Sequence, residues 1–175
     1  MHLFLTGFVQ VGKSTLIRRL LEKKTLKLGG FKTKWYPEGD GRILVMTPYT
    51  DIVSDITDDS IAARDIGKDR ITYPEVFDTI GKRILEDSTS CDLIVMDELG
   101  RLETNSEDFQ RAVISVLDGD TPVIGVIQPR QTRFLDSIRA RRDVMIIPVS
   151  EDNRNELYSL LSEVDIISKL INKNI

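Results

Sequence analysis

The amino-acid sequence is poor in residues on which several classes of protein site depend. Its 175 residues include one cysteine, Cys91, and one histidine, His2. Neither an internal disulfide bond nor a zinc site built from cysteine and histidine can therefore form, and we predict no partner for His2. Only 6% of the residues are aromatic. Trp35 and Tyr36 lie in a β-prone run, and we expect packing or edge positions for them rather than a base-stacking role.

Excess basic charge and long apolar runs are also missing. The formal net charge is −4, so no overall basic field attracts nucleic acid or an anionic membrane, and nucleic-acid binding is not expected. No apolar run approaches the roughly 18 residues of a membrane helix, and no basic start followed by an apolar stretch indicates a leader. We expect a cytoplasmic, monomeric protein without a membrane partner, folded as one domain over residues 1–175.

A glycine motif stands near the start of the sequence. Gly7 and Gly12 bracket four residues, and Lys13 and Ser14 follow, which is the pattern of a phosphate-binding P-loop. An apolar run at 2–6 and helical spacing over 14–22 supply the strand–turn–helix context, which favours this interpretation over an ordinary glycine turn. The predicted nucleotide-binding residues are Gly7, Phe8, Val9, Gln10, Val11, Gly12, Lys13, Ser14 and Thr15.

Each part of this loop has an expected chemical role. Its backbone N–H groups, at a helix N-terminus, would surround the β-phosphate of a nucleotide. We expect Lys13 to reach the β- and γ-phosphates, Ser14 to coordinate Mg²⁺, and Thr15 to donate to the α-phosphate.

Strand-like and helix-like segments alternate along the rest of the chain. Two β-prone runs, 31–36 and 43–47, flank a turn and predict a hairpin. The acidic stretch 50–70 is weakly patterned, and we expect in it either a short strand with a turn of helix or a flap over the nucleotide. Further strands and helices follow, ending in one helix that Asn153 opens and that continues to Ile171. The predicted class is α/β: a single-domain P-loop NTPase fold whose mostly parallel sheet is covered by helices on both faces, with a β-hairpin addition.

A second group of candidate residues ends a buried strand. The apolar run 92–96 leads into Asp97 and Glu98, and an Asp at the carboxyl end of a strand beside a P-loop can hold Mg²⁺. A carboxylate directly after it can polarise a water for in-line attack on the γ-phosphorus. The predicted catalytic residues are therefore Glu98 and, from the P-loop, Lys13. The alternative for Glu98 is a cap on the following loop or an ion pair with Arg101.

Several other residues follow strand ends on the expected ligand side of the sheet. Arg101, Arg130 and Arg133 are candidates to neutralise γ-phosphate charge, without a choice among them. Gln128 is a weaker candidate to position the attacking water.

Four stretches resemble the small P-loop nucleoside-triphosphatase family, which includes the cancer-related nucleoside triphosphatase and its archaeal and bacterial relatives. The stretches are residues 7–15, 29–31, 93–103 and 149–154. The string from Asp97 to Glu103 and the pair Asn153-Arg154 are much more specific than the P-loop alone.

The resemblance implies a slow, Mg²⁺-dependent hydrolase that converts nucleoside triphosphates to the diphosphate and phosphate with little base preference. In that family pattern, Ser14 and Asp97 would serve Mg²⁺ and Glu98 would activate water. Asn153 and Arg154 would lie near the base or brace the sheet edge. The sequence departs from the family at Val9 and Gln10, where Pro and Gly are usual, so we expect slower hydrolysis.

The expected activity is therefore Mg²⁺-dependent hydrolysis of ATP, GTP, CTP and UTP. Two alternatives stay open. One is a nucleotide or small-molecule kinase, which an acceptor pocket would favour. The other is a nucleotide-dependent regulatory binding module whose hydrolysis is incidental.

Overall fold

The protein is described by a computed structural model that covers residues 1–52 and 56–172. Its strands are β1 (His2–Thr6), β2 (Leu28–Glu38), β3 (Gly41–Pro48), β4 (Ile61–Ile66), β5 (Asp69–Thr72), β6 (Leu93–Leu99), β7 (Val123–Ile127) and β8 (Val144–Pro148). Its α-helices are α1 (Lys13–Leu21), α2 (Pro74–Val76), α3 (Lys82–Asp87), α4 (Glu107–Asp118), α5 (Arg133–Arg139), α6 (Arg154–Glu163) and α7 (Ile166–Ile171). Short 3₁₀ turns cover Asp58–Ser60 and Leu102–Asn105, and a π-helical segment, Phe77–Gly81, joins α2 to α3.

All eight strands form one sheet in the order β5-β4-β3-β2-β6-β7-β1-β8. The strands from β2 to β8 in this order pair in parallel, whereas β3, β4 and β5 extend the sheet antiparallel from β2. The predicted fold is confirmed, and the hairpin addition is β2 with β3. The weakly patterned stretch 50–70 supplies a 3₁₀ turn, β4 and the start of β5; its residues 53–55 lie outside the described residues.

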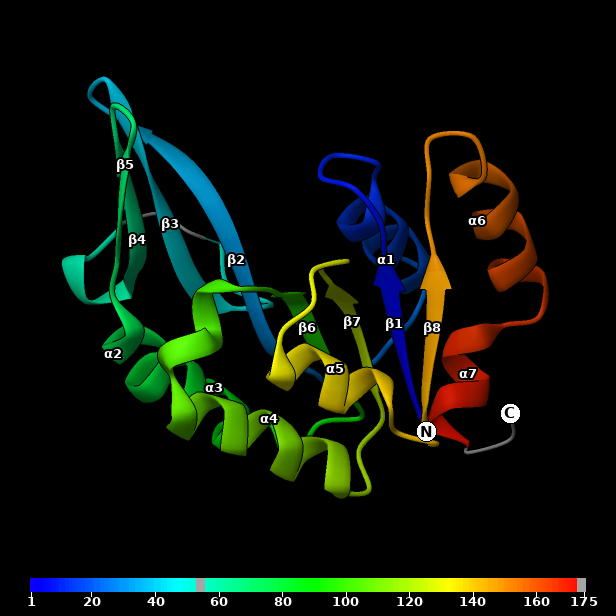
Figure 1. The fold of residues 1–175 in the computed structure, drawn as a ribbon. Helices are drawn as coiled ribbons and strands as arrows, with labels where there is room; N and C mark the ends of the chain where they lie inside the picture. Colours follow the sequence, from blue (N-terminus) through cyan, green and yellow to red (C-terminus); the bar gives the residue numbers. More distant parts are fainter. Residues whose placement is uncertain (53–55, 173–175) are drawn as a thin grey trace.

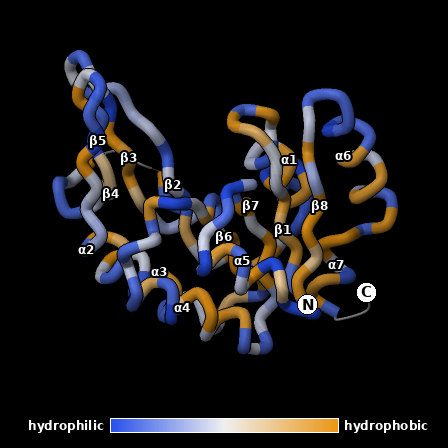
Figure 2. The backbone as a smooth tube through the Cα atoms, viewed as in Figure 1, coloured by the Kyte–Doolittle hydropathy of each residue, from blue (hydrophilic) through white to orange (hydrophobic). Residues whose placement is uncertain are grey.

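Helices cover both faces of the sheet. Successive side chains of a buried strand point to opposite faces, so each central strand packs against both helix layers. Phe4, Ile94 and Met96 belong to the cluster that contains the inner residues of α3, α4 and α5. Leu3 and Val95 belong to the cluster that contains those of α1, α6 and α7. Figures 1 and 2 show the two helix layers and the apolar central strands between them, with hydrophilic residues at the tips of the β3–β5 extension.

The strand order places the loops that follow β1, β7 and β6 side by side at one edge of the sheet. Strand β7 lies between β1, which leads into the glycine motif, and β6, which ends in the Asp97-Glu98 pair. The carboxyl ends of these parallel strands meet at the same edge, as Figure 1 shows for β1 and β8. Such an edge is the usual ligand site of an open α/β sheet.

The prediction of one continuous last helix is wrong. Helix α6 ends at Glu163, and Asp165 adopts a left-handed conformation with φ 45° before α7 begins. The Asp165 side chain accepts a hydrogen bond from the Ser168 N–H and so caps α7. After the break, Ile166, Ile167 and Leu170 of α7 lie in the core. No helix within the described residues is long and apolar enough to cross a membrane.

Candidate functional site

The glycine motif forms a loop between β1 and α1. Gly7 has φ 146°, and a side chain there would collide with the Val149 carbonyl oxygen, so only glycine fits. Gly12 precedes α1 in a left-handed conformation, and no side chain caps the helix N-terminus. The first N–H groups of α1 are therefore available to an anion.

Gln10 also has a positive φ, 67°. This is the position at which the family pattern has glycine, which adopts that conformation without strain. The loop thus keeps a backbone shape suited to glycine although the residue has changed.

The Lys13 ammonium lies inside this loop. Lys13 is 6% exposed, and its Nζ donates to the carbonyl oxygens of Gly7 at 3.0 Å and Phe8 at 2.6 Å. Burial lowers the pKa of Lys13, while the carboxylates of Glu98 and Asp97 oppose that effect. The ammonium is therefore held where the phosphates of a bound nucleotide are expected.

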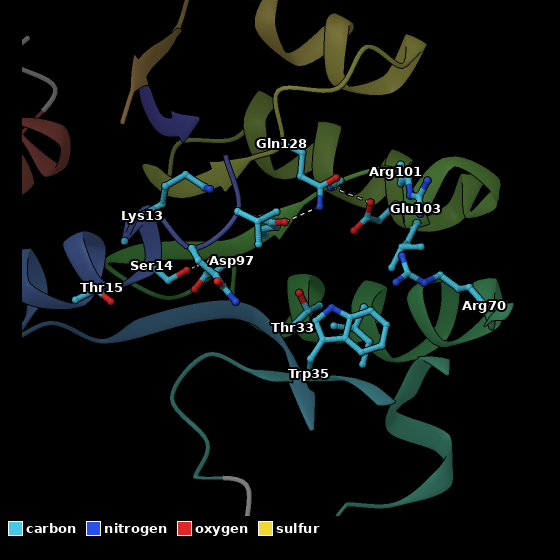
Figure 3. A pocket seen from close by; sticks show the side chains of 17 residues that line it. Lys13, Ser14, Thr15, Thr33, Trp35, Arg70, Asp97, Arg101, Glu103 and Gln128 are labelled. Atoms are coloured by element: carbon cyan, nitrogen blue, oxygen red, sulfur yellow. Dashed lines mark hydrogen bonds between the residues drawn. The ribbon is translucent and has the colours of Figure 1, made fainter. Parts of the chain in front are cut away.

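Ser14 and Asp97 meet across the sheet edge. The Ser14 hydroxyl donates to Asp97 Oδ1 at 2.8 Å, joining the start of α1 to the end of β6 (Figure 3). Burial raises the pKa of Asp97 to about 6, the hydrogen bond from Ser14 lowers it, and neighbouring Glu98 raises it further. Two oxygen ligands at hydrogen-bond distance from each other, one of them a partly desolvated carboxylate, suit a hard divalent cation.

Asp97 and Glu98 both line the same cavity. Consecutive strand residues normally point to opposite faces, but the pairing of β6 with β7 is irregular between Met96 and Leu99. The peptide bond between Asp97 and Glu98 is cis.

Glu98 is held by Gln128, the residue that follows β7. Gln128 Nε2 donates to Glu98 Oε1 at 2.5 Å, and the backbone oxygen of Gln128 accepts from Arg139. A Cβ atom on Gly100 would lie 2.6 Å from the Gln128 side chain, so glycine there leaves room for the amide. Within the described part of the chain Glu98 makes no ion pair with Arg101, the alternative that the sequence left open.

Glu103 supports the loop after β6. It is 3% exposed, and its Oε2 accepts from the Gly100 N–H at 2.9 Å. Burial raises the pKa of Glu103 to about 7. Glu103 ends the string that begins at Asp97, but the sequence could not reveal its role, because its partner is a backbone group.

These residues surround one cavity of about 460 Å³, a volume within the range of about 300–1,000 Å³ of small-molecule sites. The predicted residues Val9, Gln10, Gly12, Lys13, Ser14, Thr15, Asp97 and Glu98 line it, together with Gln128. The cavity also includes Thr33, Trp35 and Arg70, which the sequence did not place there. Trp35 packs partly against the core as predicted, and its position at the cavity could be found only from the strand order.

The remaining candidates separate. Of the three arginines, Arg101 lines this cavity, whereas Arg133 lines a separate hollow beside α4. Asn153 braces the loop after β8, since its Oδ1 accepts from the Ser150 N–H at 2.8 Å. The Arg154 side chain lies against Gly12, at the end of the P-loop that leads into α1.

Comparison with known proteins places the chain. The family model described as NTPase matches residues 2–162. The chain belongs to this NTPase family. The nucleoside-triphosphatase THEP1 of Thermotoga maritima is 33% identical over 171 residues, covering 94% of this chain and 93% of that protein. The THEP1 protein of Methanosarcina barkeri is 31% identical, covering 90% and 92%.

Solved structures support the same NTPase-family fold. The crystal structure of THEP1 from Aquifex aeolicus superposes with a TM-score of 0.68 at 21% identity, covering 97% of this chain and 99% of that one. The solution structure of a human cancer-related nucleoside triphosphatase gives 0.67 at 24% identity, covering 93% and 96%. The resemblance read from the sequence is confirmed.

Proposed function

We propose that this NTPase hydrolyses ATP, GTP, CTP and UTP to the diphosphate and phosphate, with Mg²⁺ and little base preference. Family membership supports nucleoside-triphosphate hydrolysis. The observation that carries the mechanism is the fixed position of Glu98, held by Gln128 beside Asp97 in the cavity of the P-loop.

Ser14 and Asp97 are the residues that would hold Mg²⁺. Their oxygens are 2.8 Å apart, and oxygen ligands are those that Mg²⁺ prefers. The bound ion would supply positive charge against the phosphate oxygens as the terminal phosphoryl group leaves.

The chain's own groups would perform the other parts of the reaction. The N–H groups at the start of α1 and the Lys13 ammonium bind and orient the phosphates. Glu98 orients a water and accepts its proton as the water oxygen bonds to the γ-phosphorus. The bond from that phosphorus to the β,γ-bridging oxygen breaks, and its electron pair stays with the diphosphate. Because one chain supplies all these groups, we propose a monomer; the cytoplasmic location stays a prediction.

The test is steady-state phosphate release from each of the four triphosphates, with and without Mg²⁺. Wild type should release phosphate from all four only with Mg²⁺. Glu98→Gln should bind triphosphate normally and lose about 10²-fold or more of the rate, while Lys13→Ala should weaken binding itself.

Glu163→Gln is the matched control, because Glu163 is exposed near the end of α6 and makes no contact within the described residues that an isosteric amide would remove. Wild-type turnover in Glu98→Gln would contradict the role of Glu98. Tight triphosphate binding without turnover in wild type would favour the regulatory module.

A further inference from the structure

The cavity continues past Glu98, away from the P-loop. Strand β2 pairs with β6 only as far as Lys32, opposite Asp97, and continues to Glu38 beyond that pairing. Thr33 and Trp35, which share one face of the part of β2 that extends past β6, line the cavity. Figure 3 shows Lys13 and Ser14 on one side and Arg70 and Arg101 on the other.

A bound triphosphate would not fill this end. In a P-loop the α-phosphate lies near the residue after the Lys-Ser pair, here Thr15, and the γ-phosphate lies near Lys13 and the strand-end acids. The base then extends beyond the α-phosphate, away from Glu98. The Trp35 end therefore lies beyond the γ-phosphoryl group, next to the position of the attacking water.

Trp35 and the Arg70 guanidinium that lies over its ring line this end of the cavity together. The guanidinium carbon of Arg70 lies 4.9 Å from the centre of the Trp35 ring, and that of Arg42 lies 4.4 Å from it. Both arginines bind the Asp65 carboxylate, with an Nε–Oδ distance of 2.8 Å for Arg42 and 2.5 Å for Arg70. Asp65 fixes the two guanidinium planes and partly neutralises them, so this surface favours a planar ring over a simple anion.

Arg101 adds a positive charge that no carboxylate of the described residues offsets. Its side chain is exposed at the cavity and forms neither an ion pair nor a hydrogen bond within the described ranges 1–52 and 56–172. Other arginines around the sheet extension are paired with carboxylates, such as Arg64 with Glu38 and Asp58. An unpaired guanidinium at the mouth of a cavity favours an anionic group, above all a phosphate.

We propose that the Trp35 end of the cavity binds a second ligand, a planar ring compound with an anionic group, of the nucleoside monophosphate class. The ring lies against Trp35 and the anion meets Arg101, beside the γ-phosphoryl group. There it excludes the water that Glu98 would orient, so its binding suppresses hydrolysis. The effect on hydrolysis rests on the proposed function; the binding site itself does not.

Trp35 is the only tryptophan in the chain, so tryptophan fluorescence reports on this end of the cavity alone. Protein loaded with Mg²⁺ and a non-hydrolysable ATP analogue is titrated with AMP, GMP, CMP and UMP. We expect saturable quenching by the monophosphates. Adenosine, which has the ring without the anion, and ribose 5-phosphate, which has the anion without the ring, should each bind about tenfold or more weakly than AMP.

Three variants make the test specific. Arg101→Ala should weaken AMP binding about tenfold or more. Arg142→Ala should leave it unchanged, because Arg142 is an exposed arginine just before β8, at the opposite edge of the sheet. Trp35→Leu, followed by calorimetry, should also weaken AMP binding. Wild-type AMP affinity in Arg101→Ala would overturn the proposal, and so would equal binding of ribose 5-phosphate and AMP.

Phosphate release separates this proposal from the proposed function. We expect AMP to slow release from ATP in wild type, and formation of ADP from AMP would also support the site, since transfer requires the two ligands side by side. Normal release with no effect of any monophosphate on rate or fluorescence would overturn the second site and leave the hydrolase intact. AMP binding without any hydrolysis would contradict the hydrolase and leave the site intact.

Discussion

At the scale of single residues, the contact between Gln128 and Glu98 is the most informative in the cavity. Gln128 Nε2 is committed to Glu98 Oε1 at 2.5 Å, so Gln128 acts on the reaction through Glu98 as a positioning residue. Gln128→Ala should lower phosphate release roughly 10- to 100-fold without changing triphosphate affinity, because small displacements of a reacting group cost rate. Single-turnover kinetics beside equilibrium binding of a non-hydrolysable analogue measures the two effects separately.

Gln128→Glu provides the matched comparison. It keeps the size of the side chain that packs against Gly100 but replaces the donor with a second carboxylate facing Glu98. We expect a loss at least as large as in Gln128→Ala. If Gln128→Glu retained full turnover, the hydrogen bond would have no part in placing Glu98.

The residues of the P-loop were predictable from the sequence because their chemistry is local. The spacing of Gly7, Gly12 and Lys13 itself specifies the turn and the helix start. The partner of Glu98 was not predictable, since Gln128 is 30 positions away and meets it only because β6 and β7 are neighbours. Trp35 reaches the cavity by the same kind of long-range adjacency.

At the scale of elements, the break between α6 and α7 depends on Asp165. Its side chain caps α7 and accepts from Lys24 Nζ at 2.5 Å, and its backbone is left-handed. Asp165→Ala removes the cap and places alanine in an unfavourable conformation, each change costing about 1 kcal/mol. We therefore expect the free energy of unfolding to fall by about 2 kcal/mol, measured by urea denaturation.

Asp165→Asn tests which property matters. Asparagine tolerates the left-handed conformation and caps helices about as well as aspartate, but it loses the charge opposite Lys24. Because both charged groups are partly exposed, the loss should stay below about 1 kcal/mol. Equal destabilisation by Ala and Asn would show that the ion pair, not the cap, holds the break.

Helical periodicity could not reveal this break. The apolar spacing from Leu157 to Ile171 is compatible with one helix, yet Leu160 is 53% exposed, whereas Ile166 and Ile167 are buried side by side. The apolar spacing indicated helical structure in this region. The packing of α6 against α1 and of α7 against the sheet determined where α6 ends and α7 begins.

At the scale of the whole molecule, strand order was the feature that the sequence left open. Alternating strands and helices specify a parallel sheet but are compatible with several orders. The observed order inserts β7 between β1 and β6, which brings Gln128 between the P-loop and the Asp97-Glu98 pair. It also places β2 beside β6, with the antiparallel strands β3–β5 beyond β2, and β2 carries Trp35 to the cavity.

His2, for which the sequence suggested no partner, connects distant parts of this architecture. It is 2% exposed; its Nδ1 accepts from the Val123 N–H, and its Nε2 is 3.1 Å from the Leu117 carbonyl oxygen. Burial, assisted by the charge of the chain N-terminus, lowers the pKa of His2 to about 4. NMR titration of the only histidine ring in the chain should give that value.

This pKa has a consequence for stability. The pKa of histidine in the unfolded chain is about 6.5, so the folded state favours the neutral ring. Its stabilising contribution is complete above about pH 6.5 and is lost as the pH falls toward 4. At about pH 5 the loss should reach about 2 kcal/mol.

Asp97 and Glu103 titrate in the same range with raised pKa values, and their protonation on acidification favours the folded state. The effect of His2 must therefore be read as a difference between proteins. In urea denaturation, the excess stability of wild type over His2→Gln should shrink by about 2 kcal/mol between about pH 7 and about pH 5, because glutamine does not titrate. A constant difference, or a native His2 pKa near 6.5, would show that the ring accepts a proton without disturbing the junction of α4, β7 and β1.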